Sequence, residues 1–291
     1  MPRFILPFLL LISLASPLQA APDAELWPRW QSHDAANDSR IDHRAWGALL
    51  RAYLVPGDDG VQRFHYAGVS EADRKRLDEY VDQLASTEIS AYNRDVQLAY
   101  WINLYNALTV REILRYYPVT SIREISSGLF SFGPWDKDLV EVEGEELTLN
   151  DIEHRILRPI WNDPRIHYAV NCASIGCPDL QMKAFTAGNT EAMLDRAARD
   201  YVNHPRGAQV VDGELMVSSI YVWFIEDFGG NDAGVIEHLR QYAQPPLAAA
   251  LQNVDHIDND DYDWNLNSVV DVKAERSQKR SGAGGSGAAG S

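Results

Sequence analysis

Residues 165–180 read Arg-Ile-His-Tyr-Ala-Val-Asn-Cys-Ala-Ser-Ile-Gly-Cys-Pro-Asp-Leu, and the rest of the chain is organised around this stretch. Large apolar residues at Ile166, Tyr168 and Val170 predict a short β-strand. Turn-forming residues follow over 171–179, so we expect a loop directly after the strand. Both cysteines of the chain lie in that loop. A loop that follows a strand at a sheet edge often carries reactive groups, so we look for function here.

The composition limits the kinds of partner that the protein can have. At 291 residues the chain can form one large domain or two small ones, and its 45% of hydrophobic residues suffices for a substantial core. The formal net charge of −16 repels phosphate backbones and anionic lipid surfaces. We therefore expect no nucleic-acid partner.

The two ends of the chain differ from the body. Residues 1–20 begin with a positive charge at Arg3, continue with an apolar run over 4–14 and end in a plausible cleavage site at Ala20. This pattern predicts a signal peptide and a periplasmic or secreted protein. The apolar run is too short for a membrane anchor, so we expect no membrane insertion after its removal. Residues 274–291 are rich in glycine and serine and predict a disordered tail.

The body between these ends, residues 21–273, shows no internal repeat and no dividing linker, so we predict one globular domain. The segment 93–117 has apolar residues on every side, which is typical of a buried helix. Hairpin signals stand at 139–149 and at Asp212-Gly213. The predicted fold class is α+β, with a small, mostly antiparallel sheet packed against the buried 93–117 helix and other helices around it.

Two amides, Asn103 and Asn106, lie one turn apart within the helix that we expect to be buried. A buried amide must find hydrogen-bond partners or it destabilises the fold. For Asn106 we favour a structural network. For Asn103, a structural role and a functional role are both open.

Cys172 is the first candidate for chemistry, because a thiolate attacks carbonyl carbon well once a neighbouring base or a lowered pKa activates it. His154 is the preferred base, since it lies on the predicted helix just before the cysteine strand. Asn103 is the candidate orienting group, and the backbone N–H groups of residues 173–176 are candidates for an oxyanion site. The hypothesis predicts that His154 lowers the pKa of the Cys172 thiol.

Other residues near this set are secondary candidates. Strand alternation would place His167 and Cys172 on opposite faces, so His167 is the weaker base. Glu153 cannot simply orient His154, because consecutive helical residues point about 100° apart. A metal site made by both histidines, Cys172 and Cys177 is a third alternative, but the cysteine spacing is only a partial zinc pattern. We predict no metal and no cofactor.

Several separated motifs resemble the domain-of-unknown-function family 547. They are Ala-Tyr-Trp-Ile-Asn-Leu-Tyr-Asn-Ala (99–107), Leu-Asn-Asp-Ile-Glu-His-Arg-Ile-Leu-Arg (149–158), Ile-His-Tyr-Ala-Val-Asn-Cys-Ala-Ser-Ile-Gly-Cys-Pro (166–178), Ser-Ile-Tyr-Val-Trp-Phe (219–224) with Asp227-Phe228, and Tyr-Asp-Trp-Asn-Leu-Asn (262–267). The resemblance implies that six residues occupy family positions: Asn103, Asn106, Glu153, His154, Cys172 and Pro178. It also implies that Cys177, where relatives often carry serine, does not serve the family's common purpose. The family has no settled activity.

Two functional hypotheses follow. The first is a thiol-dependent hydrolase or acyl-transfer enzyme for peptide-like or ester substrates, with Cys172, His154 and Asn103 as its catalytic residues. The second is a non-catalytic module that binds a small-molecule or peptide-like ligand or a partner. In the second, Cys172 and Cys177 form a structural disulfide, as nearby thiols often do in an oxidising compartment. The oligomeric state is not predicted by the sequence.

Overall fold

The computed structural model describes residues 22–125 and 133–269. The predicted signal peptide, residues 1–20, and the predicted tail, residues 274–291, lie outside the described residues. Among the described residues, no helix is both long and apolar enough to cross a membrane.

A central helix, α3 (Arg94–Tyr116), forms the axis of the fold. Its first turn is capped by the Asn93 side chain, which accepts a hydrogen bond from the backbone N–H of Val96. Every residue of the 96–114 segment is buried, in agreement with the apolar residues that the sequence places on all sides of this helix. The prediction of a buried helix over 93–117 is confirmed.

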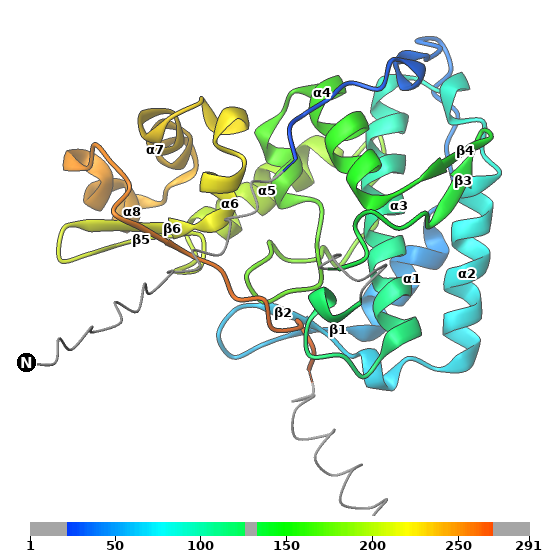
Figure 1. The fold of residues 1–291 in the computed structure, drawn as a ribbon, viewed down its shortest axis with the longest axis horizontal. Coiled ribbons are helices and arrows are strands. Elements are labelled where there is room, and N and C mark those ends of the chain that lie inside the picture. Colours follow the sequence, from blue (N-terminus) through cyan, green and yellow to red (C-terminus); the bar gives the residue numbers. More distant parts are fainter. Residues whose placement is uncertain (1–21, 126–132, 270–291) are drawn as a thin grey trace, which may run out of the picture.

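Two further helices pack near α3. Helix α1 (Arg44–Tyr53) contacts α2 (Glu71–Ala85), which lies along α3 (Figure 1). Helix α2 is capped by Ser70, whose hydroxyl accepts a hydrogen bond from the Asp73 N–H. Short helical turns connect these elements: η1 (Pro28–Gln31), η2 (Tyr66–Gly68), η3 (Ile89–Ala91) and η4 (Ile122–Glu124).

The strands form three small sheets. These are β1 (Leu54–Pro56) with β2 (Gln62–Phe64); β3 (Val140–Val142) with β4 (Glu145–Leu147); and β5 (Ala208–Val211) with β6 (Glu214–Ser218) and β7 (Asn259–Asp261). All pairs are antiparallel except β6–β7. Both predicted hairpins are confirmed, and Asp212 and Gly213 have the positive φ angles that such a two-residue turn requires. The α+β class is therefore confirmed, although the strands are divided among three sheets.

The strand predicted at 166–170 is wrong. The chain there forms a 3-10 helix, η6 (Pro164–Tyr168), in which the Asp163 side chain accepts a hydrogen bond from the Arg165 N–H. Proline at the first position is compatible with a helical turn. Residues 166–170 are all buried, so the apolar residues reflect burial on every side and do not mark one face of a strand.

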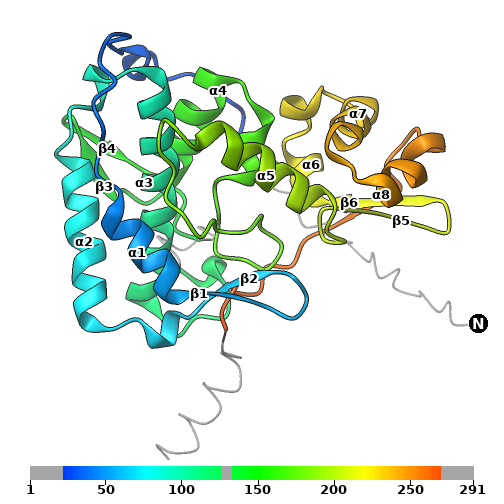
Figure 2. The same cartoon turned by 180° about the vertical axis from the view of Figure 1, so that it is seen from behind.

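The second half of the chain builds a separate cluster of buried side chains around Tyr168. Its helices are α5 (Thr190–Val202), α6 (Ser219–Trp223), η7 (Ile225–Phe228), α7 (Asp232–Tyr242), α8 (Pro245–Ala250) and η8 (Leu251–Asn253). Figures 1 and 2 show α5 between the α1–α3 group and the group formed by α7, α8, β5 and β6.

Residues 262–269, here named the closing segment, run from the β5–β7 sheet to β2 (Figure 1). The N–H of Leu266 donates to the Thr120 carbonyl, and the Asn267 carbonyl accepts from the N–H of Phe64. The N–H of Asn267 donates to the carbonyl of Ala173 in the cysteine loop. The closing segment thus joins parts of the chain that are far apart in sequence.

Candidate functional site

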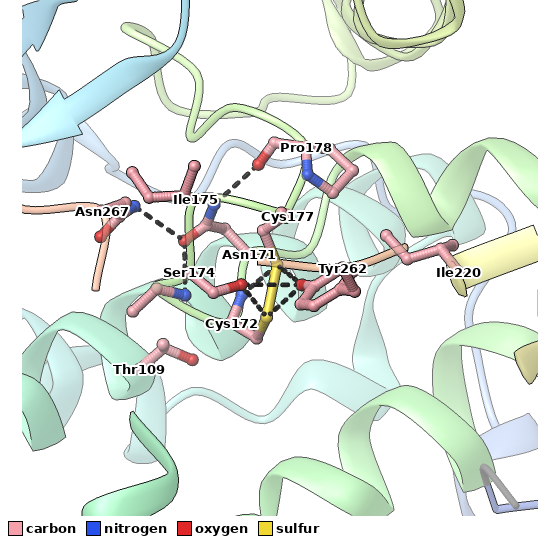
Figure 3. The surroundings of a disulfide bond; sticks show 12 residues. Thr109, Asn171, Cys172, Ser174, Ile175, Cys177, Pro178, Ile220, Tyr262 and Asn267 are labelled. Carbon is pink, nitrogen blue, oxygen red and sulfur yellow. Dashed lines mark hydrogen bonds between the residues drawn. A yellow bond between two sulfur atoms is a disulfide. The ribbon is translucent and has the colours of Figure 1, made fainter. Parts of the chain in front are cut away.

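The loop that follows η6 contains a disulfide between Cys172 and Cys177 (Figure 3). The Cys172 side chain is half-buried, whereas Cys177 is buried. The N–H of Cys172 lies 2.9 Å from the sulfur of Cys177, so the backbone also closes this short loop. Because the two sulfurs are bonded to each other, neither is a free nucleophile in this state.

The amides of the cysteine loop are already engaged. The N–H of Ala173 donates to the Asn171 side chain over 2.8 Å. The N–H groups of Ile175 and Gly176 donate to carbonyl groups of the closing segment over 2.9 and 2.8 Å. The predicted oxyanion site over 173–176 is therefore wrong for three of its four amides, because the closing segment and Asn171 already use them.

Tyr262 brings the closing segment onto the disulfide. Its hydroxyl lies 3.0 Å from the Cys172 sulfur, 3.1 Å from the Cys177 sulfur and 2.8 Å from the Ser174 hydroxyl (Figure 3). Burial raises the pKa of Tyr262 well above its ordinary value, so the hydroxyl keeps its proton and cannot act as a base for a thiol. The sequence motif at 262–267 pointed to this residue only through the family resemblance.

The two amides of α3 are used by backbone groups. Asn103 donates to the carbonyl of Phe185 over 2.8 Å and accepts from the N–H of the same residue over 3.0 Å. Asn106 donates to the carbonyl of Ala169 and accepts from the N–H of Asn171, each over 2.8 Å. Asn106 thus holds the start of the cysteine loop against α3, and Asn103 anchors the segment before α5. Neither contact reaches His154.

Glu153 and His154 lie on a π-helix, η5 (Asp151–Leu157), which continues into α4 (Arg158–Trp161). A capping box lies at the start of this helix, since the N–H of Asp151 donates to the Thr148 hydroxyl and the N–H of Thr148 donates to the Asp151 carboxylate, each over 3.0 Å. The sequence predicted an ordinary helix here. π-Helical turns are rare and frequently occur at functional sites.

His154 is held by Arg158. The guanidinium Nη1 of Arg158 lies 3.0 Å from His154 Nδ1, and arginine can only donate, so Nδ1 accepts and the ring proton sits on Nε2. Burial lowers the pKa of His154 to about 4, and the nearby Arg158 charge adds to the shift. At neutral pH His154 is therefore a neutral hydrogen-bond donor without a free lone pair for a general base.

His167 lies beside Asp227, which is also the ion-pair partner of Arg158. Its Nε2 is 2.6 Å from the Asp227 carboxylate, which also forms a two-point ion pair with Arg158, and its Nδ1 is 3.7 Å from Glu153. Burial by itself raises the pKa of the Asp227 carboxyl. The hydrogen bonds from His167 and Arg158 together have the larger effect and hold this pKa well below its usual range. We name Glu153, His154, Arg158, His167 and Asp227 the polar cluster.

The predicted site residues thus fall into two groups. Within the described chain, Cys172 has its hydrogen bonds with Ser174, Tyr262 and the second cysteine, whereas His154 is bonded to Arg158, and no hydrogen bond joins the two residues. The Glu153 charge also reaches Tyr262, where it adds to the effect of burial in raising the pKa of the hydroxyl. The residues considered for a metal site are divided in the same way, because both histidines belong to the polar cluster and both cysteines to the disulfide loop.

A cavity of about 480 Å³ lies beside His154. It is lined by Pro22, Asp23, Glu25, Asp136, Thr148, Asn150, Asp151, His154 and Arg155. Sequence reasoning did not find this cavity, because its lining comes from three separate segments without a shared motif. It also missed Arg158 and gave Asp227 no role.

The fold and the site together define an α+β domain with a disulfide-closed loop and a polar cluster in which Glu153 and His154 lie on a π-helix. Residues 89–202 match the family model described as "Protein of unknown function, DUF547". The resemblance to that family is thereby confirmed over a segment that contains α3, the π-helix and the cysteine loop. Searches of the curated proteins and of the solved structures gave no match.

Proposed function

We propose that the protein is an exported, non-catalytic module that binds a ligand or partner, with Cys172–Cys177 as a structural disulfide. The observation that carries this proposal is that every predicted catalytic group is already engaged. The Cys172 sulfur is bonded to Cys177, His154 accepts from Arg158 and carries its proton on Nε2, and Asn103 is bonded to backbone. These contacts leave neither a free thiolate nor a base to activate one.

Export is supported by the charge, apolar run and cleavage pattern of residues 1–20 and by the disulfide, because disulfides persist in oxidising compartments. Fractionation of cells that express the full chain tests this point. We expect the protein outside the cytoplasm and shortened near Ala20, as measured by intact mass. Full-length protein in the cytoplasm would contradict export.

A thiol-dependent hydrolase is the second candidate, for the reduced protein only. It is favoured by the half-buried Cys172 sulfur, which has the Ser174 and Tyr262 hydroxyls at 3.2 and 3.0 Å. In this alternative Cys172 attacks a peptide-like or ester carbonyl after reduction. A base for the thiol would still have to come from a rearranged site, because His154 donates through Nε2.

One experiment separates the two functions. The exported protein is treated with iodoacetamide with and without prior reduction, and the labels are counted by intact mass. We expect no label without reduction, and the same ligand binding before and after oxidation. A free, labelled Cys172 in native protein, together with hydrolysis of peptide or ester probes that the label abolishes, would overturn the proposal in favour of the hydrolase.

A further inference from the structure

The two sulfurs of the disulfide differ in what surrounds them. Cys172 is half-buried, whereas Cys177 is only 4% exposed. Within the described chain, two donors reach the Cys177 sulfur, namely the N–H of Cys172 over 2.9 Å and the Tyr262 hydroxyl over 3.1 Å (Figure 3). The sulfur that an incoming molecule can reach is therefore bonded to a sulfur that accepts two hydrogen bonds.

These two hydrogen bonds become stronger when the bond between the sulfurs breaks. A neutral cysteine sulfur is a weak acceptor, whereas a thiolate carries a full negative charge, and charge-assisted hydrogen bonds are roughly twice as strong as neutral ones. Burial alone disfavours a thiolate at Cys177, and the two donors act against that effect. They stabilise Cys177 as the sulfur that leaves, and a more stable thiolate leaves faster.

Tyr262 can supply its proton to the leaving sulfur. Its hydroxyl lies 3.0 Å from the Cys172 sulfur and 3.1 Å from the Cys177 sulfur, so it can turn to the sulfur that takes up charge. The Ser174 hydroxyl, at 2.8 Å, can donate to the Tyr262 oxygen in return. Burial raises the pKa of Tyr262 well above its ordinary value, so the hydroxyl stays a donor while the charge develops.

The shape of the loop does not depend on the disulfide alone. The Asn171 side-chain amide donates to the Pro178 carbonyl over 2.7 Å, across the same loop (Figure 3). The Tyr201 hydroxyl donates to the Gly176 carbonyl over 2.6 Å, and the closing segment accepts from the amides of the same turn. Opening of the disulfide therefore leaves Cys177 beside its two donors.

We propose that the Cys172–Cys177 bond is an exchange site for low-molecular-weight thiols, which form a mixed disulfide with Cys172. The thiolate of the incoming molecule attacks the Cys172 sulfur and forms a new sulfur–sulfur bond. The Cys172–Cys177 bond breaks, and its electron pair stays on Cys177, which becomes a thiolate. The incoming sulfur is oxidised and the Cys177 sulfur is reduced, so no other reagent takes part. A small thiol is required because Ser174 and Tyr262 lie against the half-buried Cys172 sulfur.

The inference goes beyond the proposed function, in which the disulfide only braces the loop. The exported, oxidised protein is incubated with 2-mercaptoethanol at about pH 8, where a thiol is partly ionised. Samples taken at early times are quenched in acid and mapped by mass spectrometry without reduction. We expect the probe on Cys172 and a free thiol at Cys177. A probe on Cys177, or opening only after the chain is unfolded in urea, overturns the inference.

Variants of the donors test how the leaving sulfur is stabilised. Tyr262→Phe keeps the ring and removes one donor, and Tyr116→Phe, at an exposed position of α3, is its matched control. We expect about tenfold slower opening in Tyr262→Phe, the loss of one hydrogen bond to a charged group, and no change in Tyr116→Phe. If the hydroxyl only shielded the sulfurs, its removal would speed the opening, and an equal or faster rate overturns the inference.

A second measurement holds even if Tyr262→Phe opens by partial unfolding. Ser174→Ala removes the hydroxyl that donates to Tyr262, and we expect slower opening here as well, by a smaller factor. In the Cys172→Ser background, Cys177 is the only thiol of the chain, and its pKa is read from the ultraviolet absorbance of the thiolate against pH. Ser174→Ala should raise this pKa.

An unchanged opening rate and an unchanged Cys177 pKa in Ser174→Ala overturn the inference. They leave the binding module standing, because a brace does not need to exchange.

Discussion

Lowering the pH from 7 to 5 is expected to destabilise this protein through three buried histidines. Burial lowers the pKa of His43, His154 and His238 to about 4 each. In the unfolded chain an imidazole has its ordinary pKa of about 6.5, so between pH 6.5 and 4 the unfolded state binds more protons. Stability must therefore rise with pH across this window and fall as the solution becomes acidic.

The size of the effect follows from the two pKa values. Moving a pKa from about 6.5 to about 4 costs about 2 kcal/mol of stability at pH 5 for each histidine. Three such groups cost about 6 kcal/mol, which is comparable to the whole stability of many domains. Carboxylates with depressed pKa values, such as Asp227, keep their stabilising charge at pH 5 and lose it only in stronger acid.

Urea unfolding followed by circular dichroism at pH 7 and pH 5 checks this prediction. His238 is the best position to change, because it lies away from the cavity and its Nε2 is 2.7 Å from the Tyr168 hydroxyl, a contact that glutamine can replace. His238→Gln should lose about 2 kcal/mol less than wild type on acidification. With an m-value of about 3 kcal/mol per molar urea, this is a difference of about 0.7 M in the midpoint.

The control is His33→Gln at an exposed position, which should follow the wild-type profile. Parallel pH profiles for wild type and His238→Gln would refute the reasoning, because they would show that burial does not keep this imidazole neutral in the folded state.

Three further predictions concern the site. Asn106→Ala should lower the free energy of unfolding by about 1–3 kcal/mol, since it leaves two buried backbone groups unpaired, and urea unfolding measures the loss. Asp227→Ala should lower it by about 3–5 kcal/mol, because it leaves a buried guanidinium without its carboxylate, and a value below about 1 kcal/mol would contradict the assigned ion pair. In reduced protein, Cys172 should alkylate before the more deeply buried Cys177, and His154→Asn should leave that rate unchanged. Peptide mapping at timed intervals measures both the order of alkylation and its rate. Slower alkylation in His154→Asn would instead support the hypothesis that the His154 imidazole activates the Cys172 thiol.

Elements of the fold could be predicted from the sequence where one local signal dominates. The 93–117 segment is apolar on all sides, and only a buried helix satisfies that pattern. The Asp212-Gly213 turn needs two positive φ angles, which these residues tolerate well. The caps at Ser70 and Thr148 are of the same kind, because capping depends on side chains only three residues apart.

The site was harder to predict because it depends on contacts that are distant in sequence. Ile166, Tyr168 and Val170 suggested a strand, but full burial produces the same residue types in a 3-10 helix. The pairing of His154 with Cys172 assumed an ordinary helix leading into that strand. The π-helix and Arg158 turn His154 to a different neighbour, and no short-range pattern shows where an arginine four residues away will point.

The closing segment has a consequence for the order in which the protein matures. It holds Phe64, Thr120 and the cysteine loop together, yet it is the last part of the described chain to leave a ribosome or a translocation channel. Contacts across about 90 to 200 residues form late, because the ends of such large loops meet slowly. Until then the Tyr262 hydroxyl does not lie against the sulfurs, and both thiols are more open to oxidation. Oxidation should therefore precede completion of the fold, so that the bond is formed in the open chain and enclosed afterwards.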